Sequence, residues 1–399
     1  MKVENKDIVF LSGVRTPFGS FGGSLKGHSA TDLGVVAAKG AIDKAGIEAS
    51  DVDHVIFGNA LQTSADALYL ARHVGLRSGV PQEVPGLTLN RLCGSGFQSI
   101  VTGAEQILLG QGDVMLCGGA ESMSQAPFTA RNIRWGVRFG KKDELSDTLW
   151  DALYDPVGGC AMGNTAENVG AKWGVTREEA DEYGFRSQMA YKAALEAGKF
   201  ADEVVPVMVK KRREEVPFTT DECPRLDADL ASMKKLRPVF AKDGLVTAGN
   251  ASAITDGAAA VVLADGAWAK ERSLPALGRL VSWGIAGVDP SLMGIGPAPS
   301  SRKALAAAGM TLDQMDLIEV NEAFAPQYLG VEKELGLNRE ITNVNGGAIS
   351  VGHPLAASGT RITLHLLHEL RRRGQRFGLG TACIGGGQGI AVIVEANLE

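Results

Sequence analysis

The chain has no long apolar run, no excess of positive charge and no closely spaced cysteine pair. Its apolar stretches, such as the one that includes residues 261–263, fall well short of the ~20 residues that a membrane-spanning helix needs. The first residues lack the apolar centre of a signal peptide. A net charge of -6 over 399 residues offers no general attraction to nucleic acid or to an anionic membrane. We therefore expect a soluble protein that is not secreted, spans no membrane and has no nucleic-acid partner.

Cysteine usage indicates a reducing compartment. The five cysteines are odd in number and scattered, without a C-x-x-C spacing: Cys93, Cys117, Cys160, Cys223 and Cys383. We expect reduced thiols, in the cytoplasm or, if the source is eukaryotic, in the mitochondrial matrix. No metal site is predicted, because the pair His365 and His368 has no third ligand nearby. A phosphate loop and a complete G-x-G-x-x-G are also missing, which argues against nucleotide-binding folds.

An internal repeat divides the chain into two similar halves. Two separate features recur at one offset of 263 residues. The first is an Ala-Gly pair that is followed, seven residues later, by an aspartate and then by an apolar strand. The second is a Ser-Gly pair that opens a helix-periodic stretch. The members are Gly46, Asp53 and Ser95 in the first half, and Gly309, Asp316 and Ser358 in the second. Apolar β-branched runs alternate with helical patterns in both halves. This order predicts an α/β fold with βαβ crossovers and mainly parallel sheets.

Residues 125–250 have no counterpart in the second half and are more charged and irregular. We interpret them as an insertion over one face of the repeat. The basic and acidic run at residues 210–215 is expected to be solvated surface.

Cys93 is the first candidate for chemistry. It follows an apolar stretch and directly precedes the helix expected to begin near Ser95, with Gly94 and Gly96 beside it. The unpaired N–H groups of a helix N-terminus favour a thiolate, so we expect a lowered pKa and a nucleophile near neutral pH. The competing interpretation is a small buried apolar residue, which is what most free cysteines are.

Three further candidates follow strands or loops of the second half. Cys383 precedes the glycine turn 385–387 between two apolar strands, where backbone N–H groups can hold an oxyanion. His353 ends a loop before the second repeated helix and can orient a thiolate, although a lone loop histidine is more often only hydrogen-bonded. Asn321 ends the strand 317–320, where it could hold a water or carbonyl oxygen or simply cap the next helix.

Together these segments resemble the thiolase family over nearly the whole chain. The matching motifs, in the family's order, are residues 90–97 around Cys93, Asn-Glu-Ala-Phe at 321–324, Gly-His-Pro at 352–354, and Cys-Ile-Gly-Gly-Gly at 383–387. The resemblance implies that Cys93 takes the acyl group as a thioester and that His353 activates it. It also implies that Cys383 moves the proton at the α-carbon of the substrate. By the same resemblance, His353 and a water on Asn321 stabilise the enolate, while the N–H groups of Cys93 and Gly385 hold the oxyanion.

The resemblance also implies the architecture. It is two duplicated βαβ halves in a five-layered αβαβα core with an inserted loop domain. The expected N-terminal half is 1–124 plus 251–273, the loop domain that binds coenzyme A is 125–250, and the C-terminal half is 274–399. Arg225 should meet the nucleotide end of coenzyme A and Ser252 its pantetheine, while Met162, Met293 and Phe324 line the substrate pocket.

The implied activity is that of an acyltransferase. It cleaves 3-ketoacyl-CoA with coenzyme A to give acetyl-CoA and a shortened acyl-CoA, and it runs the reverse Claisen condensation. Coenzyme A and acetyl-CoA are then substrates, no tightly bound cofactor or metal is implied, and a homo-oligomer, dimer or tetramer, is expected.

Other functions are weighed against this one. A ketoacyl-synthase-type condensing enzyme shares the duplicated fold but usually has a histidine-centred site in place of the Cys383 motif. A non-catalytic acyl-CoA carrier would not need all four motifs. A biosynthetic acetoacetyl-CoA thiolase commonly has a histidine where this chain has Ala161. Since residues 61–77 and 121–127 look closer to mitochondrial-type 3-ketoacyl-CoA thiolases, we expect a degradative enzyme of fatty acid β-oxidation.

Overall fold

The computed structural model describes residues 6–140 and 144–397, and its centre is one sheet of ten strands. The strands are β1 (Ile8–Arg15), β2 (Gly19–Ser20), β3 (His54–Gly58), β4 (Gly86–Leu89), β5 (Val114–Ser122), β12 (Thr255–Asp265), β13 (Gly278–Gly287), β14 (Leu317–Val320), β15 (Phe377–Ile384) and β16 (Gln388–Ala396). Their order is β14-β15-β16-β13-β1-β12-β5-β3-β4, with β2 paired to β12.

The sheet is mixed, so the expectation of mainly parallel sheets is wrong. Only β3–β4, β3–β5 and β14–β15 are parallel, while β1, β12, β13 and β16 pair antiparallel with their neighbours. The reason lies in the connections. The three-residue turn 385–387 joins β15 to β16, and so short a link permits only an antiparallel hairpin. The two halves of the sheet meet at β1 and β13, which pair over residues 8–10 and 278–280.

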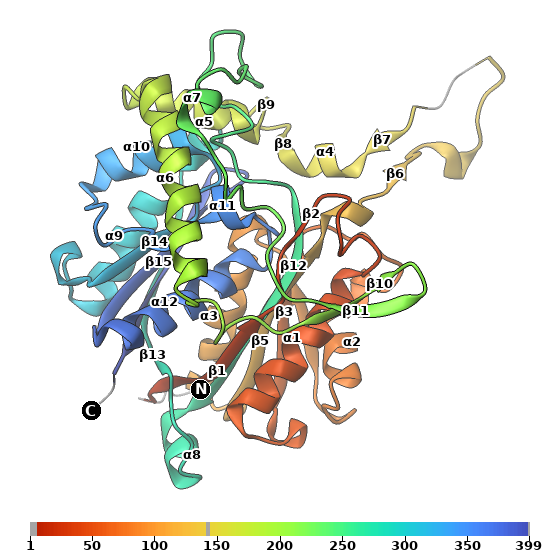
Figure 1. The fold of residues 1–399 in the computed structure, drawn as a ribbon. Helices are drawn as coiled ribbons and strands as arrows, with labels where there is room; N and C mark the ends of the chain where they lie inside the picture. Colours follow the sequence, from red (N-terminus) through yellow and green to blue (C-terminus); the bar gives the residue numbers. More distant parts are fainter. Residues whose placement is uncertain (1–5, 141–143, 398–399) are drawn as a thin grey trace.

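Helices cover both faces and fill the centre (Figure 1). They are α1 (Ala30–Ala45), α2 (Leu70–Arg77), α3 (Ser95–Leu108), α8 (Gly266–Glu271), α9 (Pro297–Ala308), α10 (Ala325–Leu335), α11 (Ala348–Val351) and α12 (Ser358–Arg373). No helix of the described residues combines the length and the apolar character needed to cross a bilayer.

The alternation of side chains along the strands shows the five layers. On β12, Val262 packs in the cluster of α1 and α2, whereas Val261 packs in the central cluster of α3 and α12. On β16, Val392 faces that same central cluster, whereas Ile393 faces the cluster of α9 and α10. Since successive strand residues point to opposite faces, the order is helix, sheet, helix, sheet, helix. The αβαβα thiolase architecture is confirmed.

The repeat is visible in matched element boundaries. α3 begins at Ser95 and α12 begins at Ser358, and these two starts are separated by the offset of 263 residues found in the sequence. α1 ends at Gly46 with φ 68°, and α9 ends at Gly309 with φ 66°. A left-handed residue at this place closes a helix at little cost only when it is glycine. The same local signals therefore stop the same helix in both halves.

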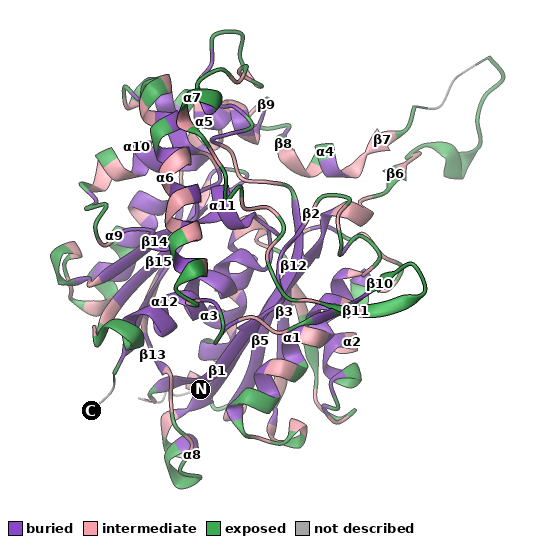
Figure 2. Ribbon diagram, in the orientation of Figure 1, coloured by how far each residue is buried: buried purple, intermediate pink, exposed green. Residues whose placement is uncertain are grey.

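Residues 125–250 lie outside this repeated core. They form α4 (Thr148–Leu153), α5 (Met162–Lys172), α6 (Arg177–Glu196), α7 (Leu230–Met233), and the short hairpins β6 (Phe128–Thr129) with β7 (Ser146–Asp147), β8 (Tyr154–Asp155) with β9 (Cys160–Ala161), and β10 (Val207–Lys211) with β11 (Glu214–Phe218). The arm of β6 and β7 projects from the body in Figure 1, and Figure 2 shows it as mostly exposed, in contrast to the buried central strands.

Candidate active site

A cavity of about 360 Å³ brings most of the predicted site residues together. It lies where the end of β15, the loop before α12 and the start of α3 meet the inserted segment. Its lining includes the predicted residues Cys93, His353, Cys383, Ser252, Met162, Met293 and Phe324. A volume of this size suits a small-molecule site.

Cys93 lies in the 3₁₀ turn Leu92–Gly94, immediately before α3. Leu92 has a φ of 47°, an uncommon left-handed value for a bulky residue, and this turn sets the direction of the cysteine that follows. The expected lowering of the pKa is wrong for the free protein. Burial raises the pKa of the Cys93 thiol to about 11, although the backbone N–H groups of Gly385 and Cys93 act in the opposite direction. The thiol is therefore protonated at neutral pH.

Cys383 is the last residue but one of strand β15 and is fully buried. Burial, and next the neighbouring Cys93, raise the pKa of its thiol above the usual range. Beyond it, Gly386 and Gly387 have φ values of 79° and 81°, which glycine adopts most readily, and the N–H of Gly385 contacts Cys93. The glycine turn that follows Cys383 thus presents the N–H of Gly385 to Cys93.

His353 is buried, and both of its ring nitrogens have neighbours. Its Nδ1 lies 2.6 Å from Oγ of Ser358, and its Nε2 lies 3.3 Å from Nδ2 of Asn321. Burial, assisted by the charge of Arg361, lowers the pKa of His353 to about 3. The imidazole is therefore neutral at pH 7, as is the Cys93 thiol. A neutral pair of this kind can pass a proton from sulfur to nitrogen as the sulfur attacks.

Asn321 follows β14 and does not cap the next helix, because its amide faces His353. Its Oδ1 is buried and has no hydrogen-bond partner among the residues that the structure describes. A buried carbonyl oxygen without a partner is costly, so this atom is suited to bind a polar group of a substrate or a water.

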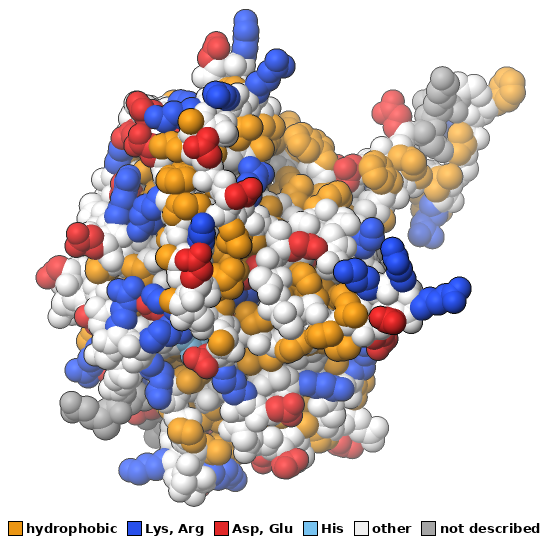
Figure 3. Space-filling view, in the orientation of Figure 1, with side chains coloured by type: hydrophobic (Ala, Val, Ile, Leu, Met, Phe, Trp, Pro, Cys, Tyr) orange, Lys and Arg blue, Asp and Glu red, His pale blue; other side chains and the backbone are white. Residues whose placement is uncertain are grey.

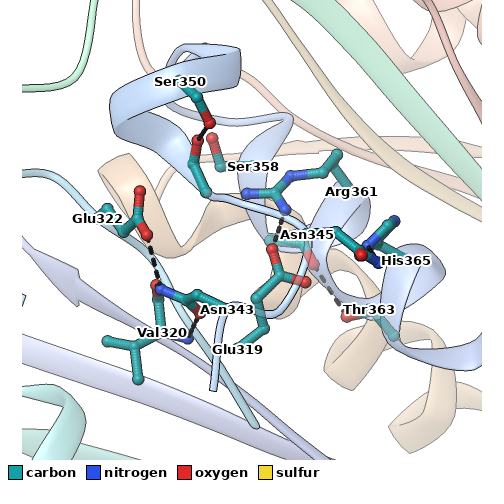
Figure 4. A network of polar contacts seen from close by, with 12 residues as sticks. Glu319, Val320, Glu322, Asn343, Asn345, Ser350, Ser358, Arg361, Thr363 and His365 are labelled. Atoms are coloured by element: carbon teal, nitrogen blue, oxygen red, sulfur yellow. Dashed lines mark hydrogen bonds and ion pairs between the residues drawn. The ribbon is translucent and has the colours of Figure 1, made fainter. Parts of the chain in front are cut away.

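A buried carboxylate fixes the backbone that carries Asn321. Glu322 accepts hydrogen bonds from the Tyr183 hydroxyl at 2.7 Å and the Ser187 hydroxyl at 2.6 Å, both on α6. It also accepts from Nδ2 of Asn343 at 3.0 Å (Figure 4). The N–H of Ile349 donates to it as well, at 3.1 Å. Ile349 belongs to α11, which ends just before His353. Glu322 therefore ties the inserted helix to both Asn321 and the approach to His353.

Glu121 holds the two halves together on the other side of the site. This fully buried carboxylate accepts from the N–H groups of Leu61 at 3.0 Å, Ala60 at 3.1 Å and Ala356 at 3.1 Å, and from Nδ2 of Asn59 at 3.0 Å. Burial raises the pKa of Glu121 to about 7, despite these donors. The link to Ala356 joins the end of β5 to the loop that carries His353.

Several lining residues are marked by no motif or periodicity in the sequence. Val239 and Phe240 reach the cavity from the irregular part of the insertion, where no periodicity marks them. The Phe240 ring stands edge-on to Phe324, with centroids 6.1 Å apart. Ser358 was visible only as the first residue of the repeated helix, and its contact with His353 appears only in three dimensions.

Arg225 stands apart from this group. It is exposed and does not line the cavity. Its backbone N–H donates to Oε1 of Gln188 at 2.8 Å, and its carbonyl accepts the N–H of Ala228 at 3.1 Å. Ser252 lines the cavity, and its N–H donates to the carbonyl of Ala323 at 3.0 Å. All five cysteines are free. Within residues 6–140 and 144–397, no three His, Cys, Asp or Glu side chains form a group that could hold a metal ion.

Comparisons with known proteins agree with this geometry. The family model for the N-terminal domain of thiolase matches residues 8–267, and the one for the C-terminal domain matches residues 274–396. The mitochondrial 3-ketoacyl-CoA thiolase of Homo sapiens is 52% identical over 98% of this chain and 99% of its own. A beta-ketothiolase of Cupriavidus necator is 50% identical over 98% and 99% of the two chains.

Solved structures give the same result. The crystal structure of the human mitochondrial 3-ketoacyl-CoA thiolase in complex with CoA has a TM-score of 0.96 at 52% identity and covers 98% of each chain. Both the four motifs and the duplicated layers are thus accounted for by one relationship. The chain belongs to the thiolase family and is an acyltransferase that acts on coenzyme A thioesters.

Proposed function

We propose that the cavity carries out thiolysis of 3-ketoacyl-CoA with Cys93 as nucleophile and Cys383 as the acid and base at carbon. The sulfur of Cys93 attacks the keto carbon while its proton passes to Nε2 of His353. The bond between C2 and C3 then breaks, its electron pair forms the enolate of acetyl-CoA, and the Cys383 thiol protonates C2. The observation that carries this proposal is the convergence of both thiols and the imidazole on one cavity.

The second half of the reaction restores the protein. Coenzyme A loses its thiol proton to Cys383 and attacks the thioester carbon, and Cys93 leaves and regains its proton from His353. Asn321, through a bound water, and His353 stabilise the enolate, and the N–H groups of Cys93 and Gly385 hold the oxyanion. The unpaired Oδ1 of Asn321 and the N–H of Gly385 beside Cys93 support these assignments. Condensation follows the same steps in reverse.

Coenzyme A is a substrate in this scheme, and we propose no tightly bound cofactor. We assign its binding to the loop domain 125–250, between an N-terminal half of 1–124 plus 251–273 and a C-terminal half of 274–399. Ser252 would meet the pantetheine inside the cavity, and the exposed Arg225 would meet the nucleotide outside it. The free cysteines are consistent with the cytoplasm or a mitochondrial matrix.

Degradation of several acyl lengths is the proposed physiological role. Three methionines, Met123, Met162 and Met293, line the cavity, and flexible thioether side chains adapt to different apolar shapes. Each methylene contributes only ~0.8 kcal/mol, so the preference should be graded. The test is kcat/KM for thiolysis of 3-ketoacyl-CoA substrates from four carbons upward. Turnover of acetoacetyl-CoA, with none for the six- and eight-carbon substrates, would instead indicate a biosynthetic acetoacetyl-CoA thiolase.

A homo-oligomer is also proposed, with the projecting arm as a contact between copies. Trp135 is 88% exposed, and Ile133, Phe139 and Leu145 are also exposed on the same arm. Figure 3 shows hydrophobic side chains along it. Exposed apolar surface of this kind marks an interaction site. Light scattering should give a dimer or tetramer that dissociates when Trp135 and Phe139 are changed to serine; a wild-type monomer would refute the proposal.

A further inference from the structure

Ser358 is the only residue of the described chain for which a contact with Nδ1 of His353 is observed. Both side chains are buried, and the Ser358 Oγ lies 2.6 Å from Nδ1 and 3.2 Å from the carbonyl oxygen of Pro354. That carbonyl already accepts the N–H groups of Ala357 and Ser358. The serine hydroxyl has only one proton to donate and two acceptors within reach, namely Nδ1 and the Pro354 oxygen that it would share with these two N–H groups.

The two orientations of this hydroxyl correspond to two forms of the imidazole. If the hydroxyl donates to Pro354, Nδ1 must carry a proton and donate to Oγ, which leaves a lone pair on Nε2. If the hydroxyl donates to Nδ1, the proton of the neutral ring lies on Nε2. Only the first form can take a proton from Cys93 at Nε2, and the second form presents an N–H to an oxyanion.

We propose that Ser358 is a positioning residue that holds His353 with its proton on Nδ1, so that Nε2 can accept the proton of Cys93. This inference rests on the proposed function. It adds a residue that acts together with the Asn321 amide, whose Nδ2 donor lies 3.3 Å from Nε2, to set which ring nitrogen acts as the base. In the reaction, the Cys93 proton moves to Nε2. The Nδ1–H keeps its hydrogen bond to Oγ of Ser358, and the Ser358 hydroxyl keeps its hydrogen bond to the carbonyl oxygen of Pro354. No other group is required for the step to balance.

The first half of the molecule shows that the role is not a general property of the repeat. Ser95 occupies the position equivalent to Ser358, and its hydroxyl accepts the backbone N–H of Arg91 at 2.8 Å. There the serine side chain stabilises only the local turn that precedes α3. Arg361, one turn beyond Ser358 on α12, is engaged instead with Glu319 (Figure 4), so it does not compete for Nδ1.

The test separates the base role of His353 from its role as a hydrogen-bond donor. In Ser358→Ala the Nδ1–H loses its acceptor, so the form with the proton on Nε2 gains population. We expect acylation of Cys93 by labelled acetyl-CoA to slow by roughly 10- to 100-fold. The KM for acetyl-CoA should be unchanged, and so should exchange of the acetyl α-protons into heavy water once the acyl-enzyme has formed.

Two variants keep the experiment decisive. Ser358→Thr retains the hydroxyl and should restore acylation, and Ser358→Cys replaces the alanine variant if that variant does not fold. Thr363→Val is the matched control, because the Thr363 hydroxyl is buried on the same helix and donates only to the carbonyl of Gly359, at 2.9 Å. Equal losses of acylation and proton exchange in Ser358→Ala, or no loss of either, would overturn the inference. Absence of acylation in the wild-type protein would refute the proposed function itself.

Discussion

At the position where the first half has Cys93, the second half has Ala356, and where the second half has Cys383, the first has Ala120. Asn321 likewise corresponds to Gly58. The scaffold positions around the site match, because β3 and β14, α3 and α12, and β5 and β15 each begin at the offset of 263. The chemistry does not match: the first half contributes the proposed nucleophile Cys93 and its N–H, and the second half contributes the proposed bases and acid and the N–H of Gly385. Neither half on its own contains a complete site.

Two buried carboxylates, one in each half, are compensated in different ways. Glu121 of the first half receives only uncharged donors, among them the N–H of Ala356. Glu319 of the second half is paired with Arg361, and both side chains are almost fully buried. Burial raises the pKa of Glu319 as well, but there Arg361 acts in the opposite direction. A buried carboxylate without a cation remains easier to protonate. Glu121 should therefore respond to pH near neutrality, and it also holds the loop of the second half through Ala356.

The largest expected effect comes from removing the two thiols one at a time. Cys93→Ala should abolish acyl-enzyme formation and reduce thiolysis by roughly 10⁴-fold or more, because the nucleophile is lost. Cys383→Ala should still become acetylated on Cys93 by acetyl-CoA, yet lose thiolysis and condensation, since proton exchange at carbon is a separate step. Peptide mapping by mass spectrometry locates the acetyl group. Label on Cys383 alone, or full turnover in Cys383→Ala, would contradict the division between the halves.

Where the halves touch, a symmetric pair of glycines is expected to matter equally. A methyl group at Gly96 would lie 2.6 Å from the backbone N of Thr360, and one at Gly359 would overlap the backbone N of Phe97. Backbone atoms cannot move aside easily, so each alanine variant should lose ~3 kcal/mol of unfolding free energy, measured in urea. Gly27→Ala is the control, because nothing lies within 4 Å of its added methyl. A loss in only one glycine variant would break the symmetry.

Much of this structure could be predicted from short motifs and their spacing. The offset between Ser95 and Ser358, the helix start after Cys93 and the glycine turn after Cys383 are all local, so the sequence shows them directly. The strand directions were wrong because the antiparallel partner of β1 is β12, which lies beyond the whole insertion. The prediction of a lowered pKa for Cys93 was wrong because it considered only the helix terminus, which is a local feature. The burial of the thiol, which raises the pKa, depends on the complete fold.

Other features could not be predicted for the same physical reason. Glu322 is held by Ser187 of α6, which is 135 positions away in the chain. Phe240 reaches the cavity from a segment without periodicity. No residue type or spacing marks such long-range partners. The roles assigned to Cys93, His353, Cys383 and the other site residues remain predictions that the experiments above address.

The smallest expected effect concerns Glu121. Because its pKa is raised from 4.5 to about 7, the folded protein binds this proton more tightly than the unfolded chain. That contribution to stability is complete below pH 4.5 and is lost as the pH rises through 7. Glu121→Gln cannot titrate, so the unfolding free energy of the wild type minus that of the variant should fall by ~1–3 kcal/mol between pH 4.5 and 8.

Glu222 provides a control of opposite sign for this measurement. Burial acts to raise the pKa of Glu222, but hydrogen bonds from Ser24 and Ser20 lower it overall. Its contribution is therefore present above the unfolded-state pKa and is lost as the pH falls through the folded-state pKa. The difference between the wild type and Glu222→Gln should thus decrease toward acid, whereas the Glu121 difference decreases toward base. A Glu121 difference that stays constant with pH would show that its four donors keep the carboxylate ionised, and the contrast with the Arg361-paired Glu319 would then disappear.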